Sequence, residues 1–335
     1  MVFIEPIISF KCDATVLSCF VFIIISFVIG VILCPIVIPM LRKLKFGQNV
    51  RDDGPETHLA KQGTPTMGGV AFLLAFVITS FFFLKGNMDG AAIMLMTLCY
   101  GLIGFLDDYI KVVKKRNLGL IARYKVAGQI IVTAAFLYGQ YYIGHINTRI
   151  SVPFTTYSFE LGMWYYPIVF LAIIFMVNAV NLTDGIDGLC SSVSFVVALG
   201  FMVISAAYGY YTNALFAVAI AGGCAGFLVW NFYPAKVFMG DTGSMFLGGA
   251  VVAMAWAVNR PEILIFMGLI YACEALSVVI QVLYFKATHG KRIFKMSPIH
   301  HHYEMSGWSE WKIVIVFCLV GAIGAAISIL AVTMI

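Results

Sequence analysis

The chain has 335 residues, of which 61% are hydrophobic and only 11% are charged, and its formal net charge is +5. A typical soluble domain carries about 25% charged residues, so a soluble fold could not hide this much apolar surface. Apolar segments follow one another to the end of the chain, and we therefore expect a single integral membrane domain over residues 1–335.

The sequence predicts an all-α polytopic membrane protein with about ten transmembrane helices, because a membrane helix needs about 20 mostly apolar residues. The first five predicted spans are approximately Leu17–Leu41, Met67–Leu84, Gly90–Leu106, Val126–Gly144 and Trp164–Asn181. The other five are about Leu189–Tyr211, Ala214–Phe232, Ser244–Val258, Glu262–Phe285 and Ile313–Met334. The residues before the first span lack the basic segment of a signal peptide, so we expect that span to be a membrane helix.

The positive charges predict the orientation of these helices. Loops on one side carry all of the lysines and arginines except Lys11, Lys85, Arg149 and Arg260. Because basic loops stay in the cytoplasm, that side is expected to be cytoplasmic and both termini are expected to lie outside. The cysteines show no metal-binding spacing, so we expect small buried side chains, with structural zinc or disulfides as alternatives.

The carboxylates cluster on the same side. Asp107, Asp108, Asp184, Asp187 and Asp241 all fall at predicted cytoplasmic helix ends. A transporter tends to place its functional charges near the bilayer midplane, where we expect only Glu274. That residue is interpreted as a protonated or hydrogen-bonded group facing other helices, or alternatively as part of a helix break or a site wall.

Two motifs flank the second and third predicted spans. In the stretch His58–Gly69, a basic loop enters a helix, and Lys61 and Thr66 could reach a phosphate. The adjacent Asp107 and Asp108 repel each other, and a divalent cation would relieve that repulsion. The alternative is that these helix-end charges pair with Lys111, one turn away.

The segment from Asn178 to Gly188 reads NAVNLTDGIDG. Asn178 and Asn181 are three residues apart and share a helix face, and two Asp-Gly pairs then turn the chain. Asp184 and Asp187 could hold ribose hydroxyls, a base edge or a metal. The alternative is a polar turn between two helices.

The segment from Asn231 to Ser244 places Asp241 just before an apolar helix. One interpretation is a helix N-cap. The other is a helix start that presents free N–H groups to phosphate, with a carboxylate that holds Mg²⁺. Phe238, at an aqueous face, could stack on a base.

Three consecutive histidines, His300, His301 and His302, lie in the segment Lys295–Glu304. They cannot all point the same way, and Mg²⁺ prefers oxygen donors, so we expect contacts with phosphate or polar substrate groups. A solvated loop and a zinc site are the alternatives. Together the clusters suit Mg²⁺-assisted phosphoryl transfer between a soluble nucleotide and a membrane lipid, and the chain lacks a Walker A motif and a kinase signature.

The stretches KQGTPTMGG, GFLDDYIKV, NAVNLTDGIDGL, WNFYPAKVFMGDTGS and MSPIHHHYE, in this order, closely resemble the phospho-N-acetylmuramoyl-pentapeptide transferases (the MraY family). That family lies within the polyprenyl-phosphate N-acetylhexosamine-1-phosphate transferases. The resemblance extends from Lys61 to Glu304, with Tyr303 standing where Phe is common. It implies ten helices with both termini outside a bacterial plasma membrane and an active site on the cytoplasmic face.

The resemblance also implies the reaction. Phospho-MurNAc-pentapeptide would pass from UDP-MurNAc-pentapeptide to undecaprenyl phosphate, giving lipid I and UMP in the first membrane step of peptidoglycan synthesis. Mg²⁺ would be required, nucleic acid would play no part, and a homodimer is expected. The alternatives are a sister transferase that uses UDP-N-acetylglucosamine and, in another class, a multi-spanning transporter.

The resemblance also implies roles for individual residues, because they stand at the positions of the family's motifs. Asp241 looks like the principal metal ligand, with Asp107 and Asp108 beside it, and these three and His300 are the candidate catalytic residues. The residues that resemble the nucleoside pocket are Asn181, Asp184, Gly185, Asp187, Asn231 and Phe238. Further candidate substrate contacts are Lys61, Thr66, Lys111, Lys125, Gln281, His300, His301 and His302.

Overall fold

The computed structural model describes residues 14–43, 61, 63–84, 88–114, 119–144 and 146–333. Its long helices are α2 (Ala14–Lys43), α3 (Gly69–Phe81), α4 (Met88–Val113), α5 (Ala122–Tyr142), α6 (Tyr165–Leu182), α7 (Leu189–Ala207), α8 (Tyr211–Asn231), α9 (Gly240–Ala257), α11 (Leu269–Ala287) and α13 (Glu310–Thr333). The short elements are β1 (Arg149–Ser151), β2 (Ser158–Glu160), η2 (Gly162–Trp164), η3 (Pro261–Ile263), α10 (Leu264–Met267) and α12 (Ile299–Glu304). The fold is therefore nearly all-α, as predicted.

Seven helices in the described part of the chain are long and apolar enough to cross a membrane. They begin at Val16, Met88, Gly162, Leu189, Tyr211, Leu269 and Glu310, and Gly69–Phe81 is a shorter apolar helix. Every predicted span overlaps one of the long helices. The predicted outer N-terminus, with Lys11 and Cys12, lies outside the described residues, as does Lys85.

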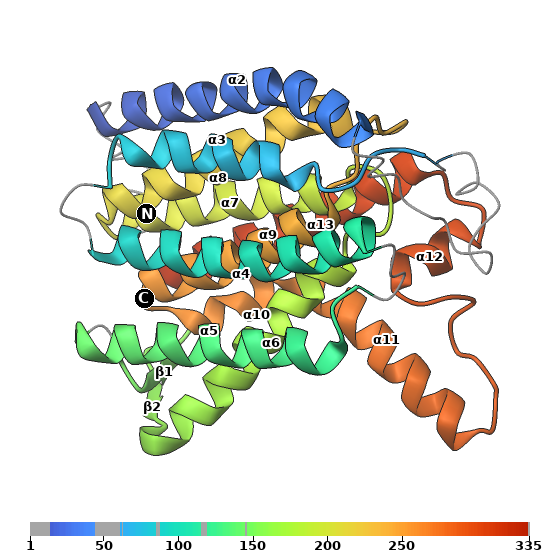
Figure 1. Ribbon diagram of the computed structural model, residues 1–335. Coiled ribbons are helices and arrows are strands. Elements are labelled where there is room, and N and C mark those ends of the chain that lie inside the picture. Colours follow the sequence, from blue (N-terminus) through green and yellow to red (C-terminus); the bar gives the residue numbers. More distant parts are fainter. Residues whose placement is uncertain are drawn as a thin grey trace.

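The helices lie side by side, with connections at two ends of the bundle (Figure 1). Helix α9 occupies the centre, where every residue from Thr242 to Trp256 is buried against α4, α6 and neighbouring helices. A central helix meets protein rather than lipid, so it needs less hydropathy than a peripheral one. Helix α2 shows the opposite pattern, since Leu17, Phe20 and Ile24 expose large apolar side chains as a lipid-facing helix would.

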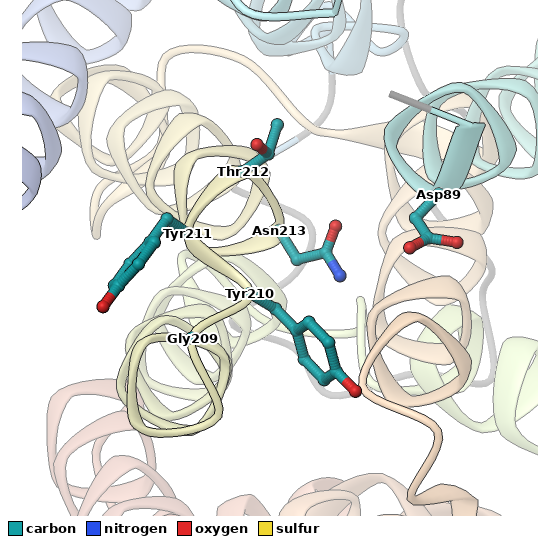
Figure 2. Close-up of a pocket in the computed structure, with 6 residues that line it drawn as sticks. All are labelled: Asp89, Gly209, Tyr210, Tyr211, Thr212 and Asn213. Carbon is teal, nitrogen blue, oxygen red and sulfur yellow. The ribbon is translucent and has the colours of Figure 1, made fainter. Parts of the chain in front are cut away.

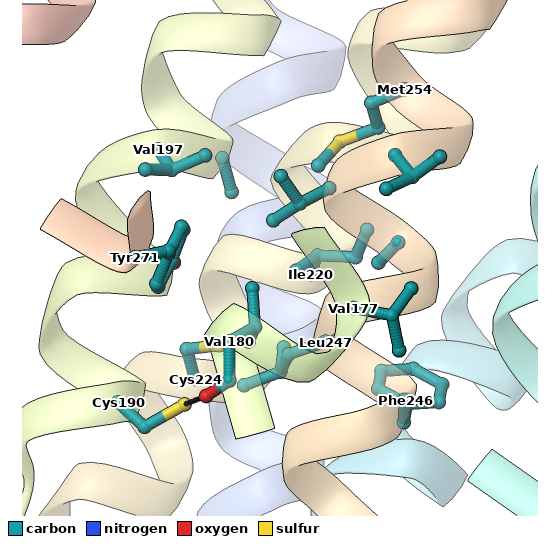
Figure 3. Close-up of a cluster of buried hydrophobic side chains, with 14 of the residues drawn as sticks. Val177, Val180, Cys190, Val197, Ile220, Cys224, Phe246, Leu247, Met254 and Tyr271 are labelled. Atoms are coloured by element: carbon teal, nitrogen blue, oxygen red, sulfur yellow. Dashed lines mark hydrogen bonds between the residues drawn. The ribbon is translucent and has the colours of Figure 1, made fainter. Parts of the chain in front are cut away.

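The core is a continuous apolar cluster in which α6, α7, α8, α9 and α11 meet (Figure 3). Val177, Ile220, Leu247 and Tyr271 are among its buried members. Cys190 donates to the carbonyl of Val180 at 3.7 Å, and Cys224 is also buried. The described cysteines are all free, and Cys273 is exposed, which departs from the expected burial.

Two local features differ from the predictions. The single helix predicted over Glu262–Phe285 is broken into η3, α10 and α11, with the break at Gly268, where a Cβ would lie 2.5 Å from the side chain of Met176. Between α5 and α6, β1 and β2 form an antiparallel hairpin in which Ile150 pairs with Phe159. Its three-residue strands are too short to give a sequence signal.

Candidate functional site

Three carboxylates from two helix ends form the centre of the site. Asp107 and Asp108 lie near the C-terminal end of α4, and Asp241 lies in the first turn of α9. One oxygen from each lies within 4.8 Å of the others. Small residues allow this approach: a Cβ at Gly104 would clash with the Asp241 carbonyl, and Gly240 adopts φ 73°. The structure thus brings together the aspartates that the sequence analysis grouped.

Asp108 caps α9 from another helix. Its oxygens accept hydrogen bonds from the backbone N–H of Asp241 at 3.2 Å, the N–H of Thr242 at 2.8 Å and the Thr242 hydroxyl at 2.7 Å. The interpretation of Asp241 as the N-cap of its own helix is wrong, because Asp241 is the second residue of α9. The expectation of free N–H groups at this helix start is also corrected, because Asp108 occupies two of them.

Two lysines reach into the carboxylate cluster. Lys111 Nζ lies 2.5 Å from Asp107 Oδ2 and 3.0 Å from Asp241 Oδ2. Lys125 Nζ lies 2.7 Å from the same oxygen of Asp241. The predicted alternative that Lys111 pairs with the α4 carboxylates is therefore observed, and Lys125 of α5 joins it.

The two asparagines that share a helix face, Asn178 and Asn181, bind different parts of the protein. Asn181 donates to Asp241 Oδ1 at 3.2 Å and to the Ser244 hydroxyl at 2.8 Å. Asn178 instead exchanges amide hydrogen bonds with Gln129 of α5, at 3.1 and 2.9 Å. Asn181 therefore orients the central carboxylate, whereas Asn178 joins α5 to α6.

A partly buried ion triad ties four segments together beside the cluster. Lys61 Nζ lies 2.8 Å from Asp187 and 2.8 Å from Glu310 at the start of α13. Glu310 also accepts the N–H of Asp187 at 3.0 Å, and Asp187 accepts the N–H of Ala235 at 2.8 Å. Burial alone would lower the pKa of Lys61, but hydrogen bonds to the two carboxylates outweigh it, so the pKa is raised. Lys61 and Asp187 thus have protein partners in this state.

Glu310 is a member of this ion triad that the sequence did not predict. Its position at the start of the last helix, on the side with the other carboxylates, was the available signal. Its two partners lie 123 and 249 residues away in the chain. No local pattern could have paired them.

The histidine segment forms the short helix α12 rather than a loop. His300 is fully buried, and its Nδ1 lies 3.0 Å from Glu274 Oε2. A Cβ on Gly185 would clash with His300 Nε2, so the imidazole packs edge-on against the Asp184–Gly185 turn. Glu274 is therefore hydrogen-bonded and faces other helices, as one of its two interpretations held. His300 would need to move to touch a substrate.

His301 and His302 make different contacts. His301 Nδ1 lies 3.0 Å from Glu304, whereas His302 Nδ1 accepts the N–H of Lys295 at 3.1 Å. The three rings do not converge on one point. The described residues contain no group of histidines placed to hold a metal.

Several predicted contact residues are engaged by the protein itself. The Gln281 amide donates to the Phe294 carbonyl and accepts the N–H groups of Ile293 and Phe294, all at 3.0–3.1 Å. Asn231 is buried and bridges the Ser191 hydroxyl to the Val237 carbonyl. These two side chains hold loops in place, and a direct substrate contact would break those bonds.

Thr66 and Phe238 lie at the edge of the cluster. The backbone of Phe238 accepts the N–H of Gly68 and donates to the Pro65 carbonyl, each at 2.8 Å. These bonds join the loop after Lys61 to the loop before α9. Phe238 and Thr66 are both partly exposed, and a Cβ at Gly240 would lie 2.9 Å from the Thr66 hydroxyl.

The residues fit a hard divalent cation. The donor set is entirely carboxylate oxygen, which suits Mg²⁺, and Asp107 Oδ2 is a buried oxygen whose ion-pair partners among the described residues are Lys111 and Lys125. Asp107, Asp108 and Asp241 would hold the ion. A bound ion would supply charge neutralisation at a reacting diphosphate.

The raised pKa of Asp184 in the folded protein predicts that the stability of the protein depends on pH. Burial and, after it, the charges of Asp241 and Asp108 together raise its pKa to about 8, against the opposing effect of a backbone hydrogen bond from Gly240. Because the folded pKa exceeds the unfolded value of about 4, ionisation destabilises the folded state as the pH rises from about 4 to about 8. Asp184→Asn should therefore raise the melting temperature of metal-free protein at about pH 9 more than at about pH 5. An equal shift at both pH values would contradict this.

A separate cavity lies at the opposite end of α4. Asp89, Tyr210 and Asn213 line this space of about 260 Å³ (Figure 2). Asp89 and Asp107 are 18 residues apart on one helix, so at 1.5 Å per residue they are about 27 Å apart. The cavity is therefore distinct from the carboxylate cluster.

Comparison with known proteins gives a consistent set of matches. Residues 90–259 match the family described as glycosyl transferase family 4, and residues 61–73 match signature 1 of the phospho-N-acetylmuramoyl-pentapeptide-transferases. The phospho-N-acetylmuramoyl-pentapeptide-transferase of Halalkalibacterium halodurans is 48% identical over 92% of this chain and 95% of its own length. Enzymes of the same name from Bacillus velezensis and Bacillus thuringiensis are 48% and 49% identical over 92% and 91% of this chain, and over 95% of each relative.

Proposed function

The chain belongs to the phospho-N-acetylmuramoyl-pentapeptide-transferase family, and we propose that it transfers phospho-MurNAc-pentapeptide from UDP-MurNAc-pentapeptide to undecaprenyl phosphate, releasing UMP. The product is lipid I. The observation that supports this most directly is the gathering of Asp107, Asp108 and Asp241 within 4.8 Å. A diphosphate donor needs such a site, because its charge must be neutralised as the bond to the leaving group breaks.

The proposed topology extends the seven apolar helices to ten spans. Helices α3, α5 and α9, together with the seven, correspond to the ten predicted segments. Both termini would lie outside and the carboxylate cluster at the cytoplasmic face of the bacterial plasma membrane, as the positive loops favour. A homodimer is part of the same expectation from the family.

The proposed chemistry is a direct in-line displacement. A lipid phosphate oxygen attacks the β-phosphorus of the donor, a new P–O bond forms, and the bond to UMP breaks. The acceptor has a second pKa near about 6, so it is mostly dianionic at neutral pH and needs little general base. Asn181 keeps Asp241 oriented, Asp108 fixes the start of α9, and Lys111 and Lys125 bring positive charge to the diphosphate.

His300 has a different proposed role from direct catalysis. It is fully buried between Glu274 and Gly185, so it would support the Asp184–Gly185 turn from behind. Lys61 and Glu310 would support the same turn through their bonds to Asp187. The nucleoside would then meet Asp184, Thr66 and Phe238 at the exposed edge.

An alternative scheme makes an aspartate the nucleophile, with a phosphoryl-enzyme intermediate. Incubating the enzyme with labelled donor in the absence of lipid distinguishes direct attack from the scheme with a phosphoryl-enzyme. Direct attack predicts no labelled protein, and a trapped adduct would refute it.

The overall function is tested by a UMP-release assay with both substrates, with and without Mg²⁺. We expect UMP only when lipid phosphate, UDP-MurNAc-pentapeptide and Mg²⁺ are all present. Equal release from UDP-N-acetylglucosamine would favour the sister transferase. Solute movement between compartments without UMP release would favour a transporter.

Phe238 provides a prediction about donor binding. Stacking of a base on an aromatic ring is worth about 1–3 kcal/mol, so Phe238→Ala should raise the KM for the donor by about tenfold or more. The KM for lipid phosphate should change little. Equal losses for the two substrates would argue against stacking on uracil.

A further inference from the structure

Two ammonium groups occupy the space between the carboxylates. Lys111 Nζ lies 2.5 Å from Asp107 Oδ2, 3.9 Å from Asp108 Oδ1 and 3.0 Å from Asp241 Oδ2. Lys125 Nζ lies 2.7 Å from Asp241 Oδ2 and 4.0 Å from Asp107 Oδ2. Both lysines therefore converge on the same two oxygens, Asp107 Oδ2 and Asp241 Oδ2.

The other oxygen of each of these carboxylates has a neutral donor. Asp107 Oδ1 accepts the N–H of Leu120 at 2.9 Å, and Asp241 Oδ1 accepts the Asn181 amide at 3.2 Å. These donors orient the carboxylates without adding charge. If the lysines withdrew, Asp107 and Asp241 would keep their orientation and each would offer a free Oδ2.

Asp108 differs from Asp107 and Asp241, because its closest partners are groups of α9 rather than lysines. Its oxygens accept hydrogen bonds from Thr242 and from the N–H of Asp241, and Lys111 is 3.9 Å away. Its bonds to α9 are independent of the lysines. The bonds of Asp108 to α9 would therefore persist if the lysines withdrew, and the oxygens that the lysines would release to a cation are those of Asp107 and Asp241.

An ammonium group and a divalent cation compete for these oxygens. Mg²⁺ binds carboxylate oxygens at about 2.0–2.1 Å, and two monovalent cations within hydrogen-bonding distance of the same oxygens would repel it strongly. Both lysines are able to move, because their side chains are 35% and 19% exposed on long flexible stems. The carboxylates can therefore bind either the two lysine ammonium groups or a divalent cation, but not both at once.

We infer that Lys111 and Lys125 are exchangeable counter-cations: they bind Asp107 and Asp241 in the metal-free chain, release them when a divalent cation binds, and then bind the diphosphate of the donor. The last step rests on the proposed function, whereas the exchange with the cation does not. One pair of side chains thereby serves two purposes. It prevents repulsion between the aspartates before metal binds and supplies positive charge to the donor afterwards.

The first measurement uses Mn²⁺ alone as a probe, with full-length protein in detergent and no substrate. Lys111→Met and Lys125→Met should each bind Mn²⁺ about tenfold or more tightly than the unsubstituted protein, because a competing charge is gone. Lys236→Met is the matched control, since Lys236 is exposed and lies over the Trp230 ring, 5.0 Å from its centroid. Its Mn²⁺ affinity should be unchanged. Weaker or equal binding in both cluster variants would overturn the inference.

The second measurement needs no substitution, so it holds even if a variant folds poorly. A brief pulse of an amine-acylating reagent, read by mass spectrometry, should label Lys111 and Lys125 faster after Mg²⁺ is added. Lys236 should not respond. Unchanged or slower labelling of Lys111 and Lys125 overturns the exchange even if the variants bind Mn²⁺ more tightly, because simple repulsion would explain that affinity.

Adding UDP to the Mg²⁺-loaded protein separates this inference from the proposed function. Renewed protection of Lys111 and Lys125 supports the transfer of the lysines to a diphosphate. If Mg²⁺ speeds the labelling of the two lysines but UDP does not slow it again, the exchange with the cation is supported and the binding of the lysines to the donor is contradicted. If the protein releases UMP in the assay described above but Mg²⁺ does not speed the labelling of the two lysines, the proposed function is supported and the exchange is contradicted.

Discussion

Replacing Asp241 with asparagine is expected to reduce turnover to below about 1% of the unsubstituted rate, in line with the 10²–10³-fold cost of losing one electrostatic contact at a reacting centre. The side chain accepts Asn181 through one oxygen and two ammonium groups through the other. Asparagine keeps the shape but removes the charge that would hold a cation. The measurement is UMP release at saturating Mg²⁺ and donor, beside the melting temperature in detergent.

The matched control is Asp89→Asn. Asp89 is a carboxylate on α4, but it lines the cavity at the far end of that helix. Its loss should leave UMP release within about twofold of the unsubstituted rate, because its charge lies about 27 Å from the carboxylate cluster. Retention of more than a few per cent activity by the Asp241 variant, with normal folding, would remove Asp241 from the proposed metal site.

The helices were predictable from the sequence because each depends on a local signal. A run of about 20 apolar residues forms a helix in lipid whatever its neighbours, since every backbone group must find a partner within the segment. Each predicted span accordingly overlaps a helix. The predicted span over Glu262–Phe285 is broken at Gly268, where a Cβ would lie 2.5 Å from the side chain of Met176 on another helix, and such a contact between helices has no local sequence signal.

The composition of the carboxylate cluster was also predictable, but its internal arrangement was not. Placing Asp107, Asp108 and Asp241 at one face followed from alternating loops. The division of roles did not, because Asp108 caps a helix that begins 132 residues later in the chain. The same holds for His300, whose burial depends on Glu274 and on a glycine in another turn. Such assignments depend on packing between distant segments, which no sequence window contains.

Replacing Lys61 with methionine is expected to destabilise the folded protein by about 3–5 kcal/mol, because removing one partner of a buried ion pair leaves uncompensated charge. Lys61 is the shared partner of Asp187 and Glu310, whose side chains are only 2% and 7% exposed. Without it, two carboxylates face each other beside the Asp184–Gly185 turn. The melting temperature in detergent should fall by several degrees, and donor binding should weaken along with it.

A double variant distinguishes this structural role from direct binding of substrate. Glu310→Gln in the Lys61→Met background removes one of the two uncompensated charges, so it should restore part of the lost melting temperature, and the two effects should be non-additive. If Lys61 acts only through the triad, donor KM recovers in parallel with stability, because Asp187 regains its place against Ala235. If Lys61 itself binds the donor, stability recovers while donor KM stays high. A single variant that melted like the unsubstituted protein would show that the triad does not hold these four segments together, and the support proposed for the Asp184–Gly185 turn would then have to come from His300 alone.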